Sequence, residues 1–329
     1  MSHSNISIFI PHLGCPHQCS FCNQKHITGQ NLMPEEKDVD SAVKIAMSSP
    51  NYNSNRTEIA FFGGSFTAID RDYMTKMLSV ACKYVEKGIV SGIRISTRPD
   101  CIDREILNIL KSYKVSAIEL GAQSMIDTVL SLNQRGHTAQ DVVNASRLIK
   151  EFGFELGLQM MTGLYGSDAE IDKNTAEKII EIKPDTVRIY PTIILKNTNL
   201  GNLYLNGTYK PQTLEETVDI CTSLLKMFEK ADIKVIRLGL HSIENDAYLA
   251  GPWHPALKEL CDNKRYRDNL DKCIQKKGNY DIFVAKNDVS KATGQKKSNI
   301  NYFKNKGINI RILPDEKLNS YEFVIKEVK

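Results

Sequence analysis

Short apolar segments of strand length alternate with longer amphipathic segments through the first two thirds of the chain. Strands are predicted over 6–10, 58–62, 92–96, 117–121, 154–160, 186–190 and 235–240, and helices over 35–47, 70–86, 104–111, 139–151, 168–181 and 214–230. Each helix must return the chain to the same end of the sheet, so the strands run parallel. The pattern predicts an α/β fold, a partial parallel (β/α)6 TIM-like barrel.

The last part of the 329-residue chain has a different pattern. A basic helical run over 257–276 precedes a strand at 280–285, short helices at 288–293 and 298–306, and strands at 308–313 and 321–326. From Gly251 to Lys329 there are 17 lysines and arginines against 10 aspartates and glutamates, an excess that indicates a polyanionic partner. We predict two domains, the barrel over 1–244 and a small basic α+β domain over 245–329.

The eight cysteines are unevenly distributed, with three of them between positions 15 and 22. Scattered single cysteines are typical of buried small side chains in a reducing compartment, whereas a tight cluster indicates a metal site. No apolar run reaches the roughly 20 residues that a membrane span needs. We therefore expect a cytoplasmic protein that does not contact a membrane. We also predict that it is a monomer.

The cluster Cys15-x3-Cys19-x2-Cys22 follows directly from the first predicted strand. In parallel α/β barrels, ligands bind at the carboxyl ends of strands. A closed zinc or iron–sulfur site usually has four protein ligands, so three thiolates leave one iron of a four-iron cluster open. The alternative is a zinc site completed by His12, His17 or His26.

The cysteine spacing resembles that of the radical S-adenosylmethionine (SAM) superfamily, in particular the branch of the Elongator catalytic subunit and oxygen-independent coproporphyrinogen oxidase. The resemblance covers about residues 5–240. The matching segments, in order, are Phe62-Gly-Gly-Ser-Phe-Thr67, Ser96-Thr-Arg-Pro-Asp100, Glu119-Leu-Gly-Ala-Gln-Ser124, Gln134-Arg-Gly-His-Thr138, Gln159-Met-Met-Thr-Gly-Leu164 and Arg188-Ile-Tyr-Pro-Thr192.

The resemblance implies a radical SAM barrel with one [4Fe-4S] cluster on Cys15, Cys19 and Cys22, and with SAM as the second cofactor. It implies that the backbone at Gly63 and Gly64 receives the SAM ammonium. A flavodoxin or ferredoxin would supply the electron.

Further cofactor-binding roles are assigned to side chains near the ends of the predicted strands. The resemblance places the adenine against Phe21, and it supports a hydrogen bond from Gln123 to the ribose. Arg135 is expected to pair with the SAM carboxylate through a forked contact. The other predicted cofactor contacts are Ser65, Ser96 and Arg98.

The small basic domain has the strand-helix-turn-helix-strand-strand order of a KH RNA-binding module, with Gly294-Gln-Lys-Lys297 in place of its GxxG turn. The predicted RNA contacts are Lys291, Gly294, Lys296, Lys297 and Asn299. The fourth turn position is a lysine, which weakens the resemblance but adds positive charge for phosphates. The alternative is a small cap over the barrel with solvated lysines.

These observations predict a radical SAM enzyme that modifies a nucleoside in RNA, with a tRNA-like substrate. One alternative is a radical SAM enzyme acting on a small metabolite, and another is an RNA-binding protein with a structural metal site. No catalytic side chain is identifiable from the sequence. Tyr190, Lys196 and His137 are candidates for the rim that faces the substrate, and Trp253 and His254 for a gate at the barrel mouth.

Overall fold

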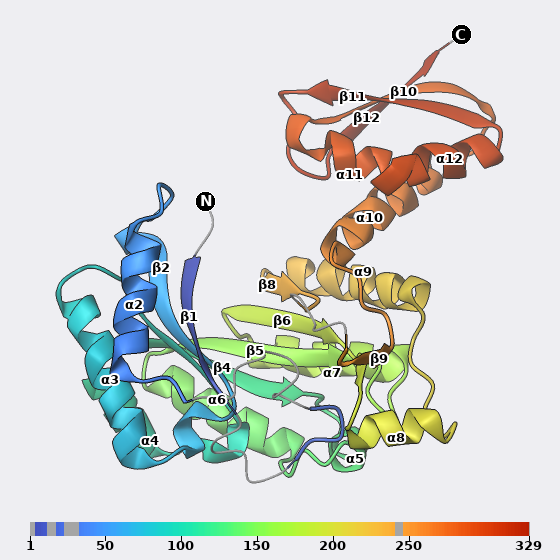
Figure 1. Cartoon of the computed structure of the whole chain (residues 1–329). Coiled ribbons are helices and arrows are strands. Elements are labelled where there is room, and N and C mark those ends of the chain that lie inside the picture. Colours follow the sequence, from blue (N-terminus) through green and yellow to red (C-terminus); the bar gives the residue numbers. More distant parts are fainter. Residues whose placement is uncertain (1–3, 12–17, 23–32, 241–245, 329) are drawn as a thin grey trace.

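The computed structural model describes residues 4–11, 18–22, 33–240 and 246–328. Its main element is a sheet of seven parallel strands in the order β1-β2-β3-β4-β5-β6-β8, which curves into a half-barrel (Figure 1). The strands are β1 (Ser4–Ile10), β2 (Thr57–Gly63), β3 (Gly92–Thr97), β4 (Val115–Gln123), β5 (Glu155–Thr162), β6 (Thr186–Pro191) and β8 (Lys234–Leu238). All seven strands predicted from the sequence are confirmed.

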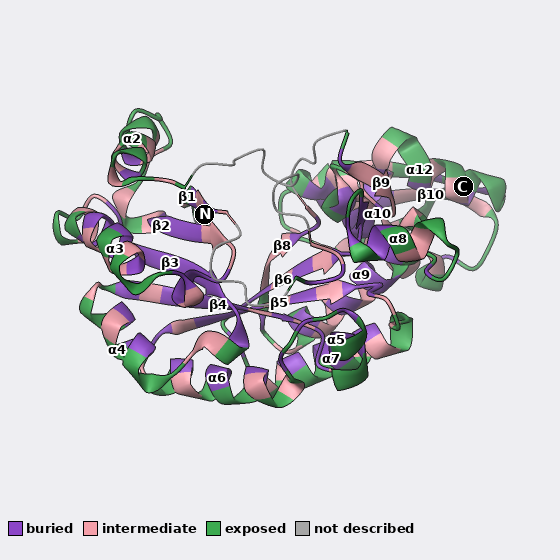
Figure 2. Ribbon diagram, turned by 60° about the horizontal axis from the view of Figure 1, so that its bottom comes forward, coloured by how far each residue is buried: buried purple, intermediate pink, exposed green. Residues whose placement is uncertain are grey.

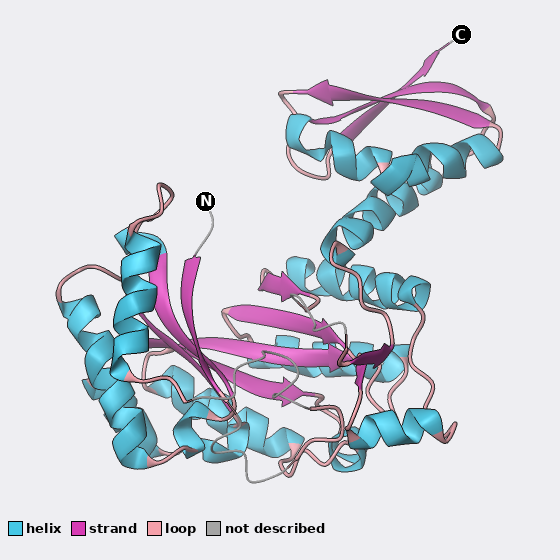
Figure 3. Ribbon diagram, in the orientation of Figure 1, coloured by secondary structure: helices cyan, strands magenta, loops and turns pink. Residues whose placement is uncertain are grey.

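Helices cover the outer face of this sheet (Figure 3). They are α2 (Glu36–Met47), α3 (Arg71–Glu86), α4 (Arg104–Ser112), α6 (Ala139–Glu151), α7 (Ala169–Ile182) and α9 (Leu214–Lys230). Most begin where a side chain accepts a hydrogen bond from an otherwise unpaired backbone N–H, as Asp103 does from Ile106 at 2.8 Å. The bounds of these six helices agree with the predicted ones to within one or two residues.

The two faces of the half-barrel differ in chemistry because successive strand residues point to opposite sides. Outward-facing residues such as Ile93, Ile95 and Leu158 belong to one buried apolar cluster shared with the helices. Inward-facing residues, including Arg94, Glu119 and Arg188, are polar or charged. The main core thus lies between the sheet and the helices, and the barrel interior is free for polar chemistry.

Four further elements lie near the carboxyl ends of the strands and were not predicted. They are α5 (Asp127–Leu132), α8 (Asn199–Leu205) and the antiparallel pair β7 (Ile194–Leu195) and β9 (Tyr248–Ala250). Each is seven residues or shorter, so none contains enough residues for a clear periodic pattern.

The C-terminal part forms a small domain on a sheet of order β11-β10-β12. Strand β10 (Gly278–Ala285) runs parallel to β11 (Ile308–Asp315) and antiparallel to β12 (Phe323–Val328). Helices α11 (Val289–Thr293) and α12 (Ser298–Asn305) pack beneath it with their own apolar cluster. The predicted order of elements in this domain is confirmed.

Helix α10 (Leu257–Cys273) connects the two parts and is shared by both apolar cores. Leu257 and Cys261 belong to the barrel cluster, whereas Tyr266 and Leu270 belong to the cluster of the small domain. Strand β9 pairs with β7, which follows β6 of the half-barrel in the chain. The packing therefore changes within α10, downstream of the 244/245 boundary expected from composition. No helix in the part of the chain that the structure describes is long and apolar enough to cross a membrane.

Candidate active site

Hydrogen bonds of Ser20 hold the end of the cysteine loop against the barrel rim. Ser20 donates its backbone N–H to the carbonyl of Asn133 at 3.1 Å and its hydroxyl to the Asn133 side chain at 2.9 Å. On its other side, the Ser20 carbonyl accepts from Leu200 N–H at the start of α8 at 2.7 Å. These contacts place Cys19 and Cys22 at the carboxyl ends of the strands, as predicted, and Cys15 lies outside the described residues.

Arg135 contacts one of the cysteines directly. Its Nη1 donates to the Cys19 sulfur at 3.0 Å, and its Nη2 donates to the carbonyl of Gly121 on β4 at 2.6 Å. Both Cys19 and Arg135 are buried. Arg135 therefore joins Cys19 to β4. Its pairing with the SAM carboxylate stays a prediction.

Arg98 forms a second buried cation behind the first. Its Nε donates to Asp100 at 2.9 Å, and its Nη2 donates to Asp100 and to the backbone carbonyl of Arg135. Burial opposes its charge, but Asp100 outweighs this and raises the pKa of Arg98. The ion pair of Arg98 with Asp100 therefore fixes the loop that contains Arg135.

The serines predicted as cofactor contacts bond to neighbouring strands. Ser65 pairs its hydroxyl with Thr97 at 2.7 Å and accepts from the backbone N–H of Arg98 at 3.2 Å. Ser96 accepts a hydrogen bond from Gln159 at 3.4 Å. Both serines lie at the predicted rim, where Ser65 joins the end of β2 to the end of β3.

Gly63 is the last residue of β2. Its φ is +121°, and a Cβ built there would lie 2.2 Å from the carbonyl oxygen of Ile10. The next residue, Gly64, donates its N–H to the same oxygen at 3.0 Å. The glycine pair therefore closes the ends of β1 and β2 together, as only a residue without a side chain permits.

We expect Gly63→Ala to lower the free energy of unfolding by about 3 kcal/mol, because backbone strain adds to a steric clash that the β1 backbone cannot relieve. Gly88 is the matched control, since it also has positive φ but would have no heavy atom within 4 Å of an added Cβ. Gly88→Ala is expected to cost about 1 kcal/mol. Urea denaturation of both variants measures the difference, and equal costs would contradict the packing argument.

Gln123 at the end of β4 carries two marks of a binding residue. Its φ is +64°, which is uncommon for a residue with a side chain, and its Oε1 is buried with no hydrogen-bond partner. Arg98 Nη1 and Arg135 Nε are likewise buried without partners among the described residues. The rim thus contains one acceptor and two donors that a polar ligand would satisfy.

This set of atoms fits the cofactors that the cysteine spacing implies. Thiolates from Cys19 and Cys22 are suitable ligands for iron, and the unpaired polar atoms of Gln123, Arg98 and Arg135 suit a nucleoside and an amino-acid group. Among the described residues no three metal-ligating side chains meet. The third predicted ligand, Cys15, falls outside them.

Phe21 lies against the apolar cluster around α8. Its ring packs in a small apolar cluster that includes Tyr165, Leu203 and Tyr204, and it is half-buried there. This contact holds the cysteine loop against α8. The stacking of Phe21 on an adenine stays a prediction, and α8 was not visible in the sequence.

His137 is buried beside the same two arginines. Its Nε2 lies 3.3 Å from the carbonyl of Ala122. Burial, together with the positive charges of Arg135 and Arg98, lowers the pKa of His137 to about 4. The ring is therefore neutral at pH 7.

The low pKa of His137 gives a pH-dependent stability. In the unfolded chain His137 binds a proton near pH 6.5, whereas in the folded protein it does so only near pH 4. The neutral ring therefore contributes fully to the free energy of unfolding above pH 6.5, and this contribution is lost as the pH falls to 4. The loss amounts to about 3 kcal/mol. We expect His137→Gln to be less sensitive to pH than the wild type across this window in urea denaturation. Parallel curves would contradict the burial of a neutral ring.

A charged network forms the interior wall of the half-barrel, with Glu119 of β4 at its centre. Arg188 of β6 donates to both oxygens of Glu119, at 2.7 and 2.8 Å, and Gln159 donates at 3.0 Å. Arg94 of β3 lies 3.5 Å from Glu119 and pairs more closely with Glu58 and Glu155. Sequence reasoning missed the network, although charged residues at alternate positions of otherwise apolar strands were a visible signal.

The remaining rim candidates are placed as follows. Tyr190 of β6 lies beside Arg188, and burial raises the pKa of its hydroxyl. Lys196 is exposed, and its backbone bonds to Ala247. Trp253 packs against the small apolar cluster of Ile193, Leu195 and Ala247. Its position near the barrel mouth is compatible with the predicted gate, which stays a prediction together with the role of His254.

The predicted RNA contacts of the small domain separate into two groups. Asn299 is 1% exposed and donates to the carbonyls of Asn263 and Ala292, and Lys291 is ion-paired with Asp288 at 2.5 Å. These two side chains are used inside the domain. Lys296 and Lys297 are exposed in the turn, with φ of +52° and +63°, and the Cβ of any residue at Gly294 would clash with Ser298.

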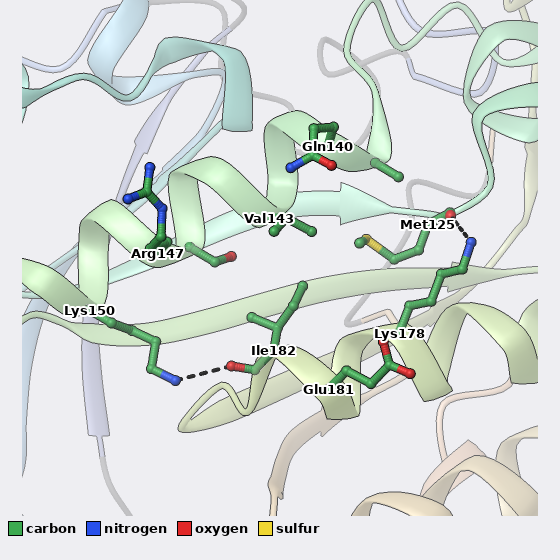
Figure 4. Close-up of a pocket in the computed structure, with 10 residues that line it drawn as sticks. Met125, Gln140, Val143, Arg147, Lys150, Lys178, Glu181 and Ile182 are labelled. Carbon is green, nitrogen blue, oxygen red and sulfur yellow. Dashed lines mark hydrogen bonds between the residues drawn. The ribbon is translucent and has the colours of Figure 1, made fainter.

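A cavity of about 590 Å3 lies between α6 and α7 on the outer, helical face of the sheet (Figure 4). Its lining includes the apolar Val143 and Ile182 and the basic Lys150 and Lys178. These lysines donate to backbone carbonyls at Ile182 and Met125, respectively. The hollow is therefore separate from the cysteine site at the strand ends.

A parallel half-barrel with thiols, an arginine pair and unpaired polar atoms at its carboxyl rim defines a cofactor-dependent α/β barrel. The family model "Radical SAM superfamily" matches residues 9–179, and "Radical_SAM C-terminal domain" matches residues 184–267. The chain belongs to the radical SAM superfamily, whose members use a [4Fe-4S] cluster and SAM.

Among curated relatives, the tRNA uridine(34) acetyltransferase of Methanocaldococcus jannaschii is 32% identical over 189 residues, which cover 51% of this chain and 35% of the relative. Elongator complex protein 3 of Dictyostelium discoideum is 28% identical over 243 residues, 68% of this chain and 43% of the relative. The chain thus spans less than half the length of either protein.

Among solved structures, the archaeal Methanocaldococcus infernus Elp3 with an N-terminal deletion matches with a TM-score of 0.67 and 21% identity. The match covers 82% of this chain and 64% of the other. At this identity the likeness shows a shared fold. It confirms the predicted half-barrel independently of the family model.

Proposed function

We propose that this protein is a radical SAM enzyme that modifies a nucleoside in tRNA. The main observation that supports this proposal is the buried contact between Arg135 and the Cys19 sulfur at the mouth of a polar half-barrel. When bound, a [4Fe-4S] cluster and SAM supply one-electron chemistry that removes a hydrogen atom from an unactivated carbon. The similarity to a tRNA uridine(34) acetyltransferase and to Elongator complex protein 3 supports a tRNA substrate.

The chain's own residues would serve this chemistry by position. Arg135 holds the Cys19 sulfur to β4, and Arg98 fixes the loop that carries Arg135. The unpaired oxygen of Gln123 would accept from a hydroxyl or amino group of the nucleoside part of SAM. The rim and the polar interior thus bind and orient, and no general base is needed for the hydrogen removal. The cytoplasmic location, the flavodoxin or ferredoxin donor and the monomeric state stay predictions.

The test is mass spectrometry of nucleosides from purified tRNA of cells with and without the protein. We expect one modified nucleoside to disappear with the gene and to return with the wild-type chain but not with Cys19→Ser. An unchanged set of tRNA nucleosides in the deletion strain would overturn the tRNA assignment.

We propose further that the turn of the small domain docks the RNA. Its exposed Lys296 and Lys297 follow Gly294 in a KH-like order of elements and suit phosphate contacts. We expect the double variant Lys296→Glu and Lys297→Glu to weaken tRNA binding by about tenfold or more and to lower its salt dependence. SAM cleavage without RNA should be unchanged.

Lys304→Glu is the matched control for this charge reversal, because Lys304 is an exposed lysine of the same domain on α12. Gel-shift titrations at several salt concentrations measure the affinities. If the control weakens binding as much as the turn variant does, net charge rather than the turn carries the interaction.

A further inference from the structure

The two edge strands β1 and β8 lie at opposite ends of the sheet (Figure 2). A second cavity opens on the inner side of the half-barrel and is lined by residues of both strands. Its volume is about 620 Å3, large enough for a nucleotide. The residues that line it include Ser7, Phe62, Arg94, Arg188, Lys234 and Arg237. It therefore lies on the polar side of the sheet.

The cations of this cavity are not equally neutralised. Arg188 is bonded to both oxygens of Glu119, and Arg94 pairs with Glu58 and Glu155. Arg237, by contrast, uses only its Nε, which donates to the backbone carbonyl of Gly239 at 2.9 Å. Neither terminal nitrogen of Arg237 has a partner among the described residues.

The strand register places Arg237 next to another cation. Arg237 of β8 is paired with Arg188 of β6, and Lys234 is paired with Thr186. A register shift between these two pairs places both β8 side chains on the same inner face, where both line the cavity. Burial and the positive charge of Arg188 lower the pKa of Arg237. Arg188 is already paired with Glu119, so Arg237 is the arginine of this strand pair that an added anion would neutralise.

We infer that Arg237 binds a phosphate group of the substrate inside this cavity, with Lys234 on the same face as a second cation. A guanidinium presents two parallel N–H donors to an anionic oxygen pair, and Arg237 has them unused. The aromatic ring of Phe62, with Arg188 5.2 Å from its centre, lies in the same cavity. A planar base and its phosphate would both find partners here.

This inference deepens the proposed function, on which it rests for the identity of the substrate. To enter the half-barrel a nucleotide must leave its base stack, since a double helix cannot enter a cavity of this volume. The phosphate belongs either to an RNA backbone or to a free mononucleotide. The experiment separates these two sources.

The RNA arm uses the reconstituted holoenzyme and an anticodon stem-loop with a uridine at the first anticodon position. Single loop phosphates are replaced in turn by neutral methylphosphonates. We expect one linkage whose neutralisation weakens wild-type binding by about tenfold or more. At that linkage Arg237→Gln should lose no further affinity, because the two changes remove one contact.

The free-nucleotide arm measures binding of uridine 5′-monophosphate against uridine by calorimetry. If the phosphate source is a mononucleotide, wild type prefers the monophosphate by about tenfold and Arg237→Gln loses that preference, even if the stem-loop does not bind. That result would keep the phosphate site while the tRNA assignment fails. Arg237→Lys should recover part of the preference, which a purely structural role would not require.

Arg147→Gln is the control, since Arg147 is an exposed arginine of α6 on the outer helical face. Our inference is overturned if Arg237→Gln and Arg147→Gln bind both probes like the wild type. It is also overturned if the Arg237→Gln loss is the same on phosphate and methylphosphonate linkages at every position.

Discussion

Cys19→Ser is expected to yield a folded protein that retains little iron and cleaves no measurable SAM. Serine is a poor ligand for the iron of such a cluster, and it also removes the sulfur on which Arg135 Nη1 rests at 3.0 Å. The measurements are iron and sulfide content after anaerobic reconstitution, and release of 5′-deoxyadenosine under reductant.

Cys82→Ser provides the matched control for this substitution. Cys82 on α3 is 8% exposed, as is Cys19, but it belongs to the apolar cluster between sheet and helices. We expect the control to keep its iron and its activity. If both variants lose iron equally, burial of a thiol rather than its position at the rim explains the effect. Full activity in Cys19→Ser would exclude Cys19 as a ligand.

Glu119→Gln is expected to lower the free energy of unfolding by about 3–5 kcal/mol, the typical cost of leaving a buried partner charge unpaired. Glu119 is 1% exposed and neutralises Arg188 through two hydrogen bonds. The substitution keeps the shape of the side chain, so urea denaturation reports mainly the loss of charge.

Glu151→Gln is the control for Glu119→Gln. Glu151 pairs with Arg104 at 2.7 Å, but both side chains are largely exposed. Exposed pairs contribute about 0–1 kcal/mol, and the control should show a cost in that range. A similarly small cost for Glu119→Gln would mean that solvent, rather than Glu119, neutralises the barrel interior.

The order of elements was predictable because it depends on local periodicity. Alternating apolar residues in β5 and the amphipathic run of α9 each reveal an element within its own segment. The short α8 has no such signal, and its contact with Phe21 therefore remained hidden. The contribution of α10 to two apolar clusters was hidden for a related reason, since one continuous helix gives no local sign of the change.

For the site, the chemistry of the residues was readable but their partners were not. Cys19, Gln123 and Arg135 were named from motifs. Only the fold shows that Arg135 contacts the sulfur while Gln123 keeps an unpaired oxygen. Conversely, Asn299 matched a motif and is buried in hydrogen bonds of the small domain.

The order of strands and helices, the candidate sulfur ligands and the basic turn follow from residues close together in the chain, where spacing and side-chain type are decisive. The neutralisation of Arg188 by Glu119, and the absence of a described partner for the terminal nitrogens of Arg237, were decided only by the tertiary structure. The physical reason is that charge pairing depends on which strands become neighbours. Residues 69 positions apart meet across the sheet, and no local pattern encodes that distance.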